Sequence, residues 1–347
     1  MPPDTGASCR PVLPYHPTKQ ALCQSPPPMP KNQPASSKPV TRLAPSPTGA
    51  LHLGNARTFI VNWAMARTRG WQVRLRMEDL DGPRIKAGSA ERTIELLSWM
   101  GLDWDGDTIV QSSDLSPYHE AMKGLCAAGD VFPCNLSRGE IQAASSAPQE
   151  GASEKAYPRS LRPTNAGEPV EFVEETHNYR FLVEESSTTI EDLVAGSRTF
   201  RLPRETGDFV AWTRRGTPAY QLSVVVDDIR QGVTDVVRGD DLLESAARQT
   251  LLYKALDRPS PRWWHLPLVL GPDGHRLAKR HGDTRVDTYR AQGMTAGKLI
   301  GLMATWCGLR PSLEEMTMEQ FLDDFNLDLM SREPITFTEQ EHAWLAS

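Results

Sequence analysis

The sequence predicts an α/β fold, in which a parallel sheet with covering helices is split by an α+β insertion and followed by a small helical region. Strand-like and helix-like apolar patterns alternate up to about residue 115 and again from residue 220, as in parallel α/β sheets. The stretch between them is rich in short strand and turn signals, which indicates an insertion. The 347 residues, 39% of them hydrophobic, suffice for a large core and more than one domain.

The first half of the sheet follows a proline-rich stretch over residues 1–40, which we expect to be disordered. "TRLAP" predicts a short strand, and after a Pro/Gly turn the run "NARTFIVNWAMARTRG" predicts a helix that ends at Gly70. "WQVRLRM" alternates with a period of two and predicts a strand with Arg74 and Arg76 on its polar face. "SAERTIELLSWMGL" predicts an amphipathic helix capped by Ser89.

The second half of the sheet is expected from residue 220 onward. The nearly continuous apolar run "QLSVVVDDI" predicts a buried strand that ends in two aspartates, and "VTDVVRG" predicts a further strand. "DDLLESAARQTLLYKAL" predicts a helix, in which the spacing of Asp241 and Glu244 suits a capping box. The remainder is mostly helical, with "TAGKLIGLMATWCGL" and "TMEQFLDDF" as the clearest segments.

These patterns divide the chain into five expected regions. The insertion begins with a helix at "YHEAMKGLCAAG" and contains strand-like segments such as "YRFLVEES" and "GDFVAWTRRGTPAY". In chain order, the regions are a disordered tail at residues 1–40, the first half of the sheet domain at 41–115 and the inserted domain at 116–219. The second half of the sheet domain follows at 220–265, and a loop with a helical region at 266–347.

Composition and charge exclude several classes of protein. No apolar run approaches the ~18 residues of a membrane span, and the N-terminus has no apolar core of signal-peptide type, so we expect a cytoplasmic protein without membrane contact. The five cysteines have no paired spacing, which argues against a disulfide framework. The net charge of -6 argues against nucleic-acid binding over the whole surface but allows local basic patches. We expect a monomer.

A first candidate site, "PSPTGALHLGN", lies where the first predicted strand meets the first predicted helix. Main-chain N–H groups at the start of a helix favour phosphate, and Gly49 and Gly54 would let a ligand approach the main chain closely. His52 would donate to a phosphate oxygen. The alternative is a Pro/Gly turn with an ordinary surface histidine.

A second candidate site is the basic loop "HRLAKRHGDT", which contains Arg276, Lys279 and Arg280. A lysine on a glycine-bounded loop can neutralise a polyphosphate leaving group as its charge develops. The alternative is a solvated basic loop. The two candidate sites together indicate phosphate chemistry more strongly than either does alone.

Two further residues lie at predicted strand ends, where ligands of open α/β sheets bind. Glu78 in "RMEDLD" would hold an ammonium group, or it is an ordinary solvated acid. Arg238 in "VVRGDDL" suits a carboxylate, or it pairs structurally with Asp240 or Asp241.

In this order, the motifs resemble those of the class I aminoacyl-tRNA synthetases. "PSPTGALHLGN" is similar to their HIGH signature and "RLAKR" to their KMSKS signature. "RLAPSPTG", "RMEDLD", "AYQLSVVVDD" and "VVRGDDLL" resemble the glutamyl branch of that family. The resemblance covers about residues 41–330 and implies a Rossmann-type catalytic domain that is split by the insertion.

The resemblance also implies roles for particular residues. The glutamate site would be formed by Arg42, Leu43, Ala44, Pro45, Ser46, Glu78, Tyr220 and Arg238. The arginines would bind carboxylates, and Glu78 would lie near the α-ammonium group. ATP, as its Mg2+ complex, would be bound by His52, Gly54, Asn55 and Lys279, of which His52, Gly54 and Lys279 would be catalytic.

Chain length indicates the activity within this branch. Only 67 residues follow Arg280, which leaves no room for the anticodon-binding domain of the longer members. Resemblance to the short members of this branch implies that the protein activates L-glutamate with ATP without tRNA. It also implies transfer of the glutamate to queuosine at the wobble base of tRNA(Asp). The alternatives are a truncated glutamyl-tRNA synthetase that charges tRNA(Glu) and a non-catalytic tRNA-binding paralogue.

Two departures from the family pattern concern the signatures and a zinc site. Asn55, Leu277, Ala278 and Arg280 replace usual signature residues, whereas His52, Gly54 and Lys279 are retained. Many members have two cysteines, a tyrosine and a third cysteine in the insertion. Here Cys134 and Tyr157 match, but Leu136 and Leu161 stand at the other two positions and cannot bind zinc. We therefore expect no metal, and an insertion stabilised by apolar packing.

Overall fold

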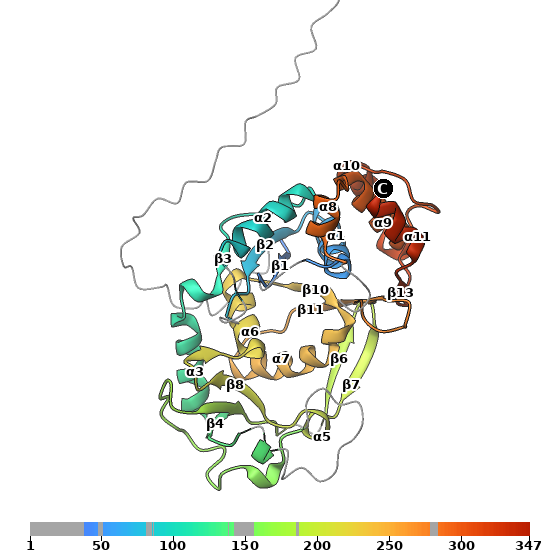
Figure 1. Cartoon of the computed structure of the whole chain (residues 1–347). Helices are drawn as coiled ribbons and strands as arrows, with labels where there is room; N and C mark the ends of the chain where they lie inside the picture. Colours follow the sequence, from blue (N-terminus) through green and yellow to red (C-terminus); the bar gives the residue numbers. More distant parts are fainter. Residues whose placement is uncertain are drawn as a thin grey trace, which may run out of the picture. The chain divides into compact units, whose positions relative to one another are not determined.

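The structure is a computed structural model, drawn in Figure 1. It describes residues 38–47, 51–80, 85, 87–137, 139–141, 156–184, 187–277 and 284–347. All of them belong to one unit, Ala35–Ser347. The tail expected over residues 1–40 lies outside the described residues except for its last three, and Gly49, Ala278, Lys279 and Arg280 also lie outside them.

Three parallel strands form the first part of the central sheet, in the order β1-β2-β3. The strands and the helices between them are β1 (Val40–Leu43), α1 (Leu53–Thr68), β2 (Gln72–Met77), α2 (Ser89–Trp99) and β3 (Ile109–Val110). The strands and helices predicted for this region are therefore confirmed. Gly70, with a φ of 67°, follows α1 as expected of a helix-terminating glycine.

Two details of this region differ from the prediction. Gly88, with a φ of 75°, occupies the N-cap position of α2, and Ser89 is already the first helical residue. Arg76 was expected on a polar face, but it is fully buried. The alternation of β2 could not reveal this, because the acidic partners that make the burial of Arg76 tolerable come from a distant segment.

A second group of strands runs beside β1, in the order β10-β11-β6-β7. These strands are β10 (Asp235–Gly239), β11 (Arg262–Leu266), β6 (Thr188–Asp192) and β7 (Gly196–Phe200). The N–H of Thr234 donates to the carbonyl of Val40 at 2.9 Å, just before β10 begins. β1 and β2 are parallel. The start of β1 contacts Thr234, just before β10, and its later residue Arg42 contacts Val237 within β10, so β1 and β10 run in the same direction. The carboxyl ends of β1, β2 and β10 therefore meet at one edge of the sheet.

The run "QLSVVVDDI" forms a helix, so the predicted strand is wrong. It belongs to α6 (Tyr220–Gln231), in which every residue from Gln221 to Asp228 is buried. A segment that is buried on nearly all sides shows no polar positions at helical spacing, so its periodicity cannot distinguish a helix from a buried strand. The two aspartates therefore lie on a helix beside the sheet.

The capping box predicted at Asp241 and Glu244 does not form. A 3-10 turn, Asp240–Leu242, precedes α7 (Leu243–Ala255). Glu244 accepts hydrogen bonds from Thr206 and Arg248, and Asp241 accepts one from Arg276 at 2.5 Å.

The insertion contains helices and a separate antiparallel sheet with the order β4-β5-β8-β9. Its elements are α3 (Ser116–Ala128), β4 (Val131–Cys134), β5 (Asn178–Phe181), α5 (Leu202–Glu205), β8 (Phe209–Thr213) and β9 (Thr217–Pro218). Within the same sequence range, β6 pairs with β11 through Asp192 and Trp263. Part of the inserted sequence therefore extends the sheet of the catalytic domain.

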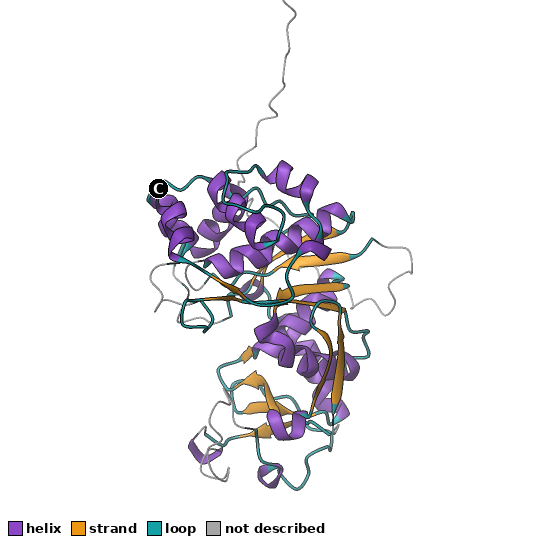
Figure 2. Cartoon of the chain, turned by 90° about the vertical axis from the view of Figure 1, so that its right-hand side faces the viewer, coloured by secondary structure: helices purple, strands orange, loops and turns teal. Residues whose placement is uncertain are grey.

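The C-terminal region is helical, as predicted. It contains β12 (Val269–Leu270), α8 (Val286–Ala291), α9 (Ala296–Trp306), α10 (Met318–Asp324), β13 (Ile335–Thr336) and α11 (Glu339–Ala346). Capping boxes begin α10 at Thr317 and α11 at Thr338. Figure 2 shows this helical region at one end of the described unit and the insertion sheet at the other.

Two large apolar clusters stabilise these elements. One joins β1, β2, α1 and α2 to the C-terminal helices, and the other joins the insertion to α6, α7, β10 and β11. The insertion therefore shares a core with the second half of the catalytic domain. Among the described residues, no helix combines the length and the apolar character that crossing a membrane requires.

Candidate active site

Arg42 is fixed at the carboxyl end of β1 by three elements. It is 6% exposed, and its Nη1 donates to the carbonyl of Val237 in β10 at 3.2 Å. Its Nε lies 3.4 Å from Oδ1 of Asp228 in α6, without the geometry of a hydrogen bond. Asn62 of α1 donates to the carbonyl of Arg42 at 2.9 Å. The guanidinium is therefore held by long-range contacts rather than by β1 alone.

The segment after β1 connects this arginine to Glu78. The carbonyl of Pro45 accepts a hydrogen bond from the N–H of Glu78 at 3.0 Å, and Ser46 is exposed. The side chain of Leu43 is fully buried in the core, so only its main chain is available to a ligand. Ala44 is half-buried.

Glu78 belongs to a buried network of opposite charges. Its Oε1 accepts from Nη2 of Arg76 at 3.1 Å, and Nη1 of Arg76 donates to Oδ1 of Asp228 at 2.7 Å. Nε of Arg76 lies 3.8 Å from Oδ2 of Asp227. Burial raises the pKa of Glu78, although Arg76 and Arg42 act in the opposite direction. The Glu78 side chain remains 15% exposed and lines the cavity described below.

Arg238 lies at the end of β10 and is 5% exposed. It donates to His265 in β11, Gln249 in α7 and the carbonyl of Leu242. The alternative pairing with Asp240 or Asp241 is not observed among the described residues. Burial lowers the pKa of Arg238, because its immediate partners are neutral.

A cavity of about 1410 Å³ extends from this edge of the sheet into the insertion. Ser46, Glu78 and Tyr220 line its catalytic-domain side. Tyr220 begins α6 and is 44% exposed. The insertion contributes arginines and polar side chains, including Arg180, Asn178, Arg214 and Arg215. Three of the expected glutamate residues, Ser46, Glu78 and Tyr220, therefore meet at this cavity, whereas the buried Arg42 and Arg238 are not among the residues that line it.

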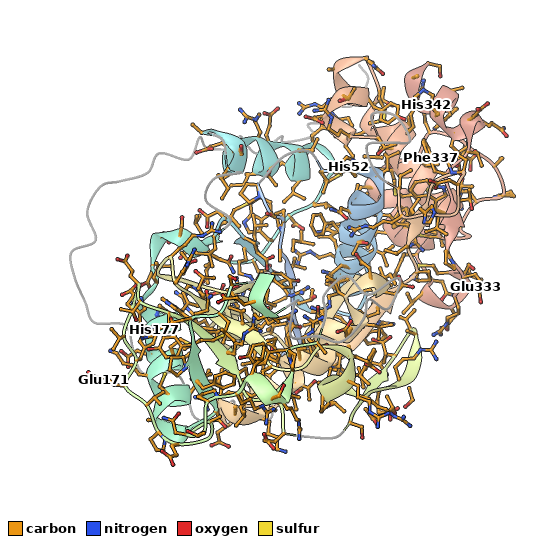
Figure 3. All side chains as sticks on the ribbon, turned by 60° about the horizontal axis from the view of Figure 1, so that its bottom comes forward. His52, Glu171, His177, Glu333, Phe337 and His342 are labelled. Carbon is orange, nitrogen blue, oxygen red and sulfur yellow. The ribbon has the colours of Figure 1, made fainter. Side chains whose placement is uncertain are left out.

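His52 lies at the N-cap position of α1, beside the segment that follows the predicted lysine loop (Figure 3). Its Nδ1 is 3.2 Å from Oγ1 of Thr284, and the N–H of Leu53 donates to the carbonyl of Thr284 at 3.1 Å. The N–H of Val286 donates to the carbonyl of Leu51 at 2.9 Å. The start of α1 is therefore joined to a segment more than two hundred residues away, only a few residues beyond Lys279.

Gly54 and Asn55 occupy the first turn of α1. A Cβ at Gly54 would meet the Cβ of Val269 at 3.6 Å, which is an ordinary van der Waals contact. Gly54 is therefore not required by its immediate protein neighbours, and the expectation that it admits a ligand stays a prediction. Asn55 is exposed.

The four zinc-site positions lie together at the tip of the insertion. Cys134 and Tyr157 are buried, and Leu136 and Leu161 pack against the same small cluster. The Tyr157 hydroxyl donates to the carbonyl of Leu161 at 2.9 Å and lies 3.7 Å from Sγ of Cys134. The residues present supply one thiol and two aliphatic side chains, so they do not fit a zinc ion.

The sequence did not identify several residues that hold this site. Asp227 and Asp228 were recognised only as the end of a supposed strand, although paired acids in a buried run are themselves a signal for a buried partner. His265 and Asp192 gave no such signal, because their importance depends on pairing between β10, β11 and β6.

The fold and this site define a class of protein. The chain belongs to the glutamyl and glutaminyl branch of the class I tRNA synthetases, because the family model described as "tRNA synthetases class I (E and Q), catalytic domain" matches residues 38–344. A crystal structure of a glutamate-tRNA synthetase from Elizabethkingia anophelis has a TM-score of 0.74 at 25% identity, over 89% of this chain and 70% of that one.

Relatives within the branch are more specific. The chain is 42% identical to the Glutamyl-Q tRNA(Asp) synthetase of Rhodopirellula baltica, over 85% of this chain and 93% of that protein. It is 43% identical to the protein of the same name from Symbiobacterium thermophilum, over 85% and 94%. It is 39% identical to Glutamate--tRNA ligase 1 of a Methylobacterium strain, but covers 63% of that longer protein.

Proposed function

We propose that this chain activates L-glutamate with ATP, without needing tRNA, and transfers the glutamyl group to queuosine at the wobble base of tRNA(Asp). The observation that carries the proposal is the identity of 42–43% to two proteins named Glutamyl-Q tRNA(Asp) synthetase, over 93–94% of their length. The site supports it, because Glu78 lines the cavity at the sheet edge where β1 and β10 bring the buried Arg42 and Arg238.

In the first step, a carboxylate oxygen of glutamate attacks the α-phosphorus of ATP, which enters as its Mg2+ complex. The bond between the α-phosphorus and the bridging oxygen breaks, and pyrophosphate leaves with the bonding electrons. Glu78 would hold the ammonium group, while Arg42 and Arg238 would attract the carboxylates. His52 and Lys279 would stabilise the negative charge that moves onto the phosphates. The rate then depends on positioning, without a covalent enzyme intermediate.

In the second step, a hydroxyl oxygen of the queuosine ring attacks the activated carbonyl of the adenylate and loses its proton, and AMP leaves as the bond between the acyl carbon and the phosphate oxygen breaks. The acceptor must approach from the open side of the cavity, which the insertion lines. Arg214 and Arg215 are exposed there, and their positive charge suits the phosphates of an RNA loop. The overall charge of -6 makes this local patch, rather than the whole surface, the expected RNA contact.

The alternatives remain a truncated glutamyl-tRNA synthetase and a non-catalytic tRNA-binding paralogue. We further propose a monomeric cytoplasmic enzyme whose insertion is stabilised by apolar packing instead of zinc. The division into a tail, a split catalytic domain, an insertion and a helical region stays part of this proposal.

The test is glutamate-dependent exchange of labelled pyrophosphate into ATP. Exchange in the absence of tRNA is expected. Exchange that begins only when tRNA(Glu) is added would instead support the truncated synthetase, and the absence of exchange under both conditions would support a non-catalytic paralogue. Aspartate and glutamine serve as control amino acids.

A further inference from the structure

A buried chain of hydrogen bonds leads from Asp192 through His265 to Arg238. The three residues lie on the neighbouring strands β6, β11 and β10, and they are 6%, 0% and 5% exposed. Nδ1 of His265 is 2.6 Å from Oδ2 of Asp192, and Nε of Arg238 donates to Nε2 of His265 at 3.0 Å. The contacts therefore connect an acid in the inserted sequence to a proposed substrate-binding arginine.

This geometry determines which imidazole nitrogen carries the proton. A carboxylate can only accept, so Nδ1 of His265 must be the donor to Asp192. Nε2 then has a free lone pair, which accepts the N–H of Arg238. Burial lowers the pKa of His265, which favours the same neutral form.

The other contacts of Arg238 are neutral as well. Nη1 donates to Oε1 of Gln249 at 2.9 Å, and Nη2 donates to the carbonyl of Leu242 at 3.2 Å. The amide of Gln249 is itself oriented, because its nitrogen donates to Oε1 of Gln221 at 3.0 Å. Three of the five guanidinium N–H groups are thus used by uncharged acceptors, and two remain for another partner.

None of the three acceptors of Arg238 is charged, and the carboxylate that acts on it, Asp228, is in direct contact with Arg76 instead. A buried cation without a carboxylate in direct contact is costly unless a ligand supplies one. Arg42 makes the surroundings still more positive, since its charge also acts on Arg238. A carboxylate accepts hydrogen bonds from a guanidinium, and Nη1 and Nη2 of Arg238 each retain one donor. The neutral partners therefore fix the orientation of Arg238 without consuming its charge.

We infer that Asp192 and His265 are positioning residues, which hold Arg238 in register for a carboxylate of the amino-acid substrate. The inference rests on the proposed function and deepens it, because it assigns the glutamate affinity partly to residues that do not contact glutamate. Asp192 also accepts hydrogen bonds from the N–H groups of Val194 and Ala195 at 2.9 and 2.7 Å. Asp192 thus also stabilises the turn that follows β6. A test must therefore distinguish the effect of Asp192 on this turn from its effect on the orientation of Arg238.

Asp192→Asn provides this separation. The remaining oxygen would keep the contacts with Val194 and Ala195, and the new amide group would face Nδ1 of His265. Because the amide donates, Nδ1 must then accept, and the proton of His265 moves to Nε2. Two N–H groups, those of His265 and Arg238, would then face each other. The shape of the site stays nearly the same while the hydrogen bond is lost.

Two substitutions of His265 form a matched pair. His265→Asn can still reach Asp192, because its amide nitrogen approximates Nδ1, but it leaves no acceptor for Arg238. His265→Gln places an amide oxygen near the position of Nε2, so it can accept from Arg238. We expect the glutamine variant to retain more affinity for glutamate than the asparagine variant. This order holds although the asparagine variant reproduces the contact of His265 with Asp192 more closely.

The experiment measures tRNA-independent pyrophosphate exchange by the full-length chain over a range of glutamate and ATP concentrations. Asp192→Asn and His265→Asn should raise the KM for glutamate about 10- to 100-fold, the scale of a buried charged donor that loses its acceptor. The KM for ATP and kcat should stay within about threefold, because the contact with the glutamate carboxylate is lost equally in the ground state and in the transition state. Thr199→Val, which removes an exposed hydroxyl contact of the same β6–β7 hairpin, is the control and should leave both KM values unchanged.

The outcomes separate the inference from the proposed function. Wild-type exchange together with an unchanged glutamate KM in Asp192→Asn would overturn the inference alone. Equal losses in His265→Asn and His265→Gln, with kcat and both KM values affected alike, would also overturn it, since they would indicate a structural role. If the wild-type chain shows no glutamate-dependent exchange, the proposed function fails and the inference fails with it.

Discussion

Substitution of Arg76 by methionine should strongly destabilise the protein. Arg76 is fully buried and lies 2.7 Å from Asp228, 3.1 Å from Glu78 and 3.8 Å from Asp227. Burial alone lowers the pKa of Arg76, but these three carboxylates together raise it above its ordinary value. Methionine would retain much of the packing and leave the acids without their main counter-charge. Removing one partner of a buried ion pair costs about 3–5 kcal/mol, which is the expected loss of unfolding free energy.

The assay is urea unfolding followed by tryptophan fluorescence, with the free energy of unfolding extrapolated to zero denaturant. Arg76→Met combined with Asp228→Asn should lose less than the sum of the two single losses, because the second substitution removes a carboxylate that the first leaves unpaired. Arg76→Lys, which keeps a charge but not the forked geometry, should be intermediate. A loss below about 1 kcal/mol for Arg76→Met, or strict additivity in the double variant, would refute the account of this network.

Three further predictions concern the lysine loop, the insertion and Glu78. Lys279→Ala should slow pyrophosphate exchange about 100- to 1,000-fold while glutamate binding, measured by calorimetry, changes little; equal effects on both would contradict its assignment to the phosphates. Elemental analysis of the purified protein should find far less than one zinc per chain, and a stoichiometric amount would refute the predicted apolar tip. Glu78→Gln should weaken glutamate binding. It should also raise Tm above that of the wild type, by a difference that increases as the pH rises. The reason is that burial raises the folded-state pKa of Glu78: below the unfolded value of about 4.3 both states are protonated, whereas above the folded-state value the wild type carries a buried charge. A Tm difference that is the same at pH 4 and pH 7.5 would contradict this.

The local patterns that the sequence predicted correctly are those with one polar and one buried face. α2 shows its period because it contacts solvent on one side, and Gly70 is recognisable by its backbone requirement. β2 shows its period at Gln72 and Arg74, which are half-buried, but not at Arg76, which is buried like its apolar neighbours. The α6 run failed for the opposite reason, since burial on nearly every side removes the polar positions that reveal a period.

The motifs selected residues of which three share one cavity, but they did not predict how these residues are held. Ser46, Glu78 and Tyr220 were all expected at the glutamate site, and all line the same cavity. The burial of Arg76 and the role proposed for His265 depend on partners from other elements, Asp228 and Asp192. The paired acids Asp227 and Asp228 in a buried run indicate a buried partner but not which residue it is, and His265 and Asp192 give no signal in a single sequence.

The most direct test of the central claim is transfer of labelled glutamate to purified tRNA(Asp) with and without queuosine. The proposed function predicts labelling of the queuosine-containing tRNA(Asp) alone, and no labelling of tRNA(Glu). Equal labelling of both forms of tRNA(Asp), or labelling of tRNA(Glu) at its 3' end, would contradict it.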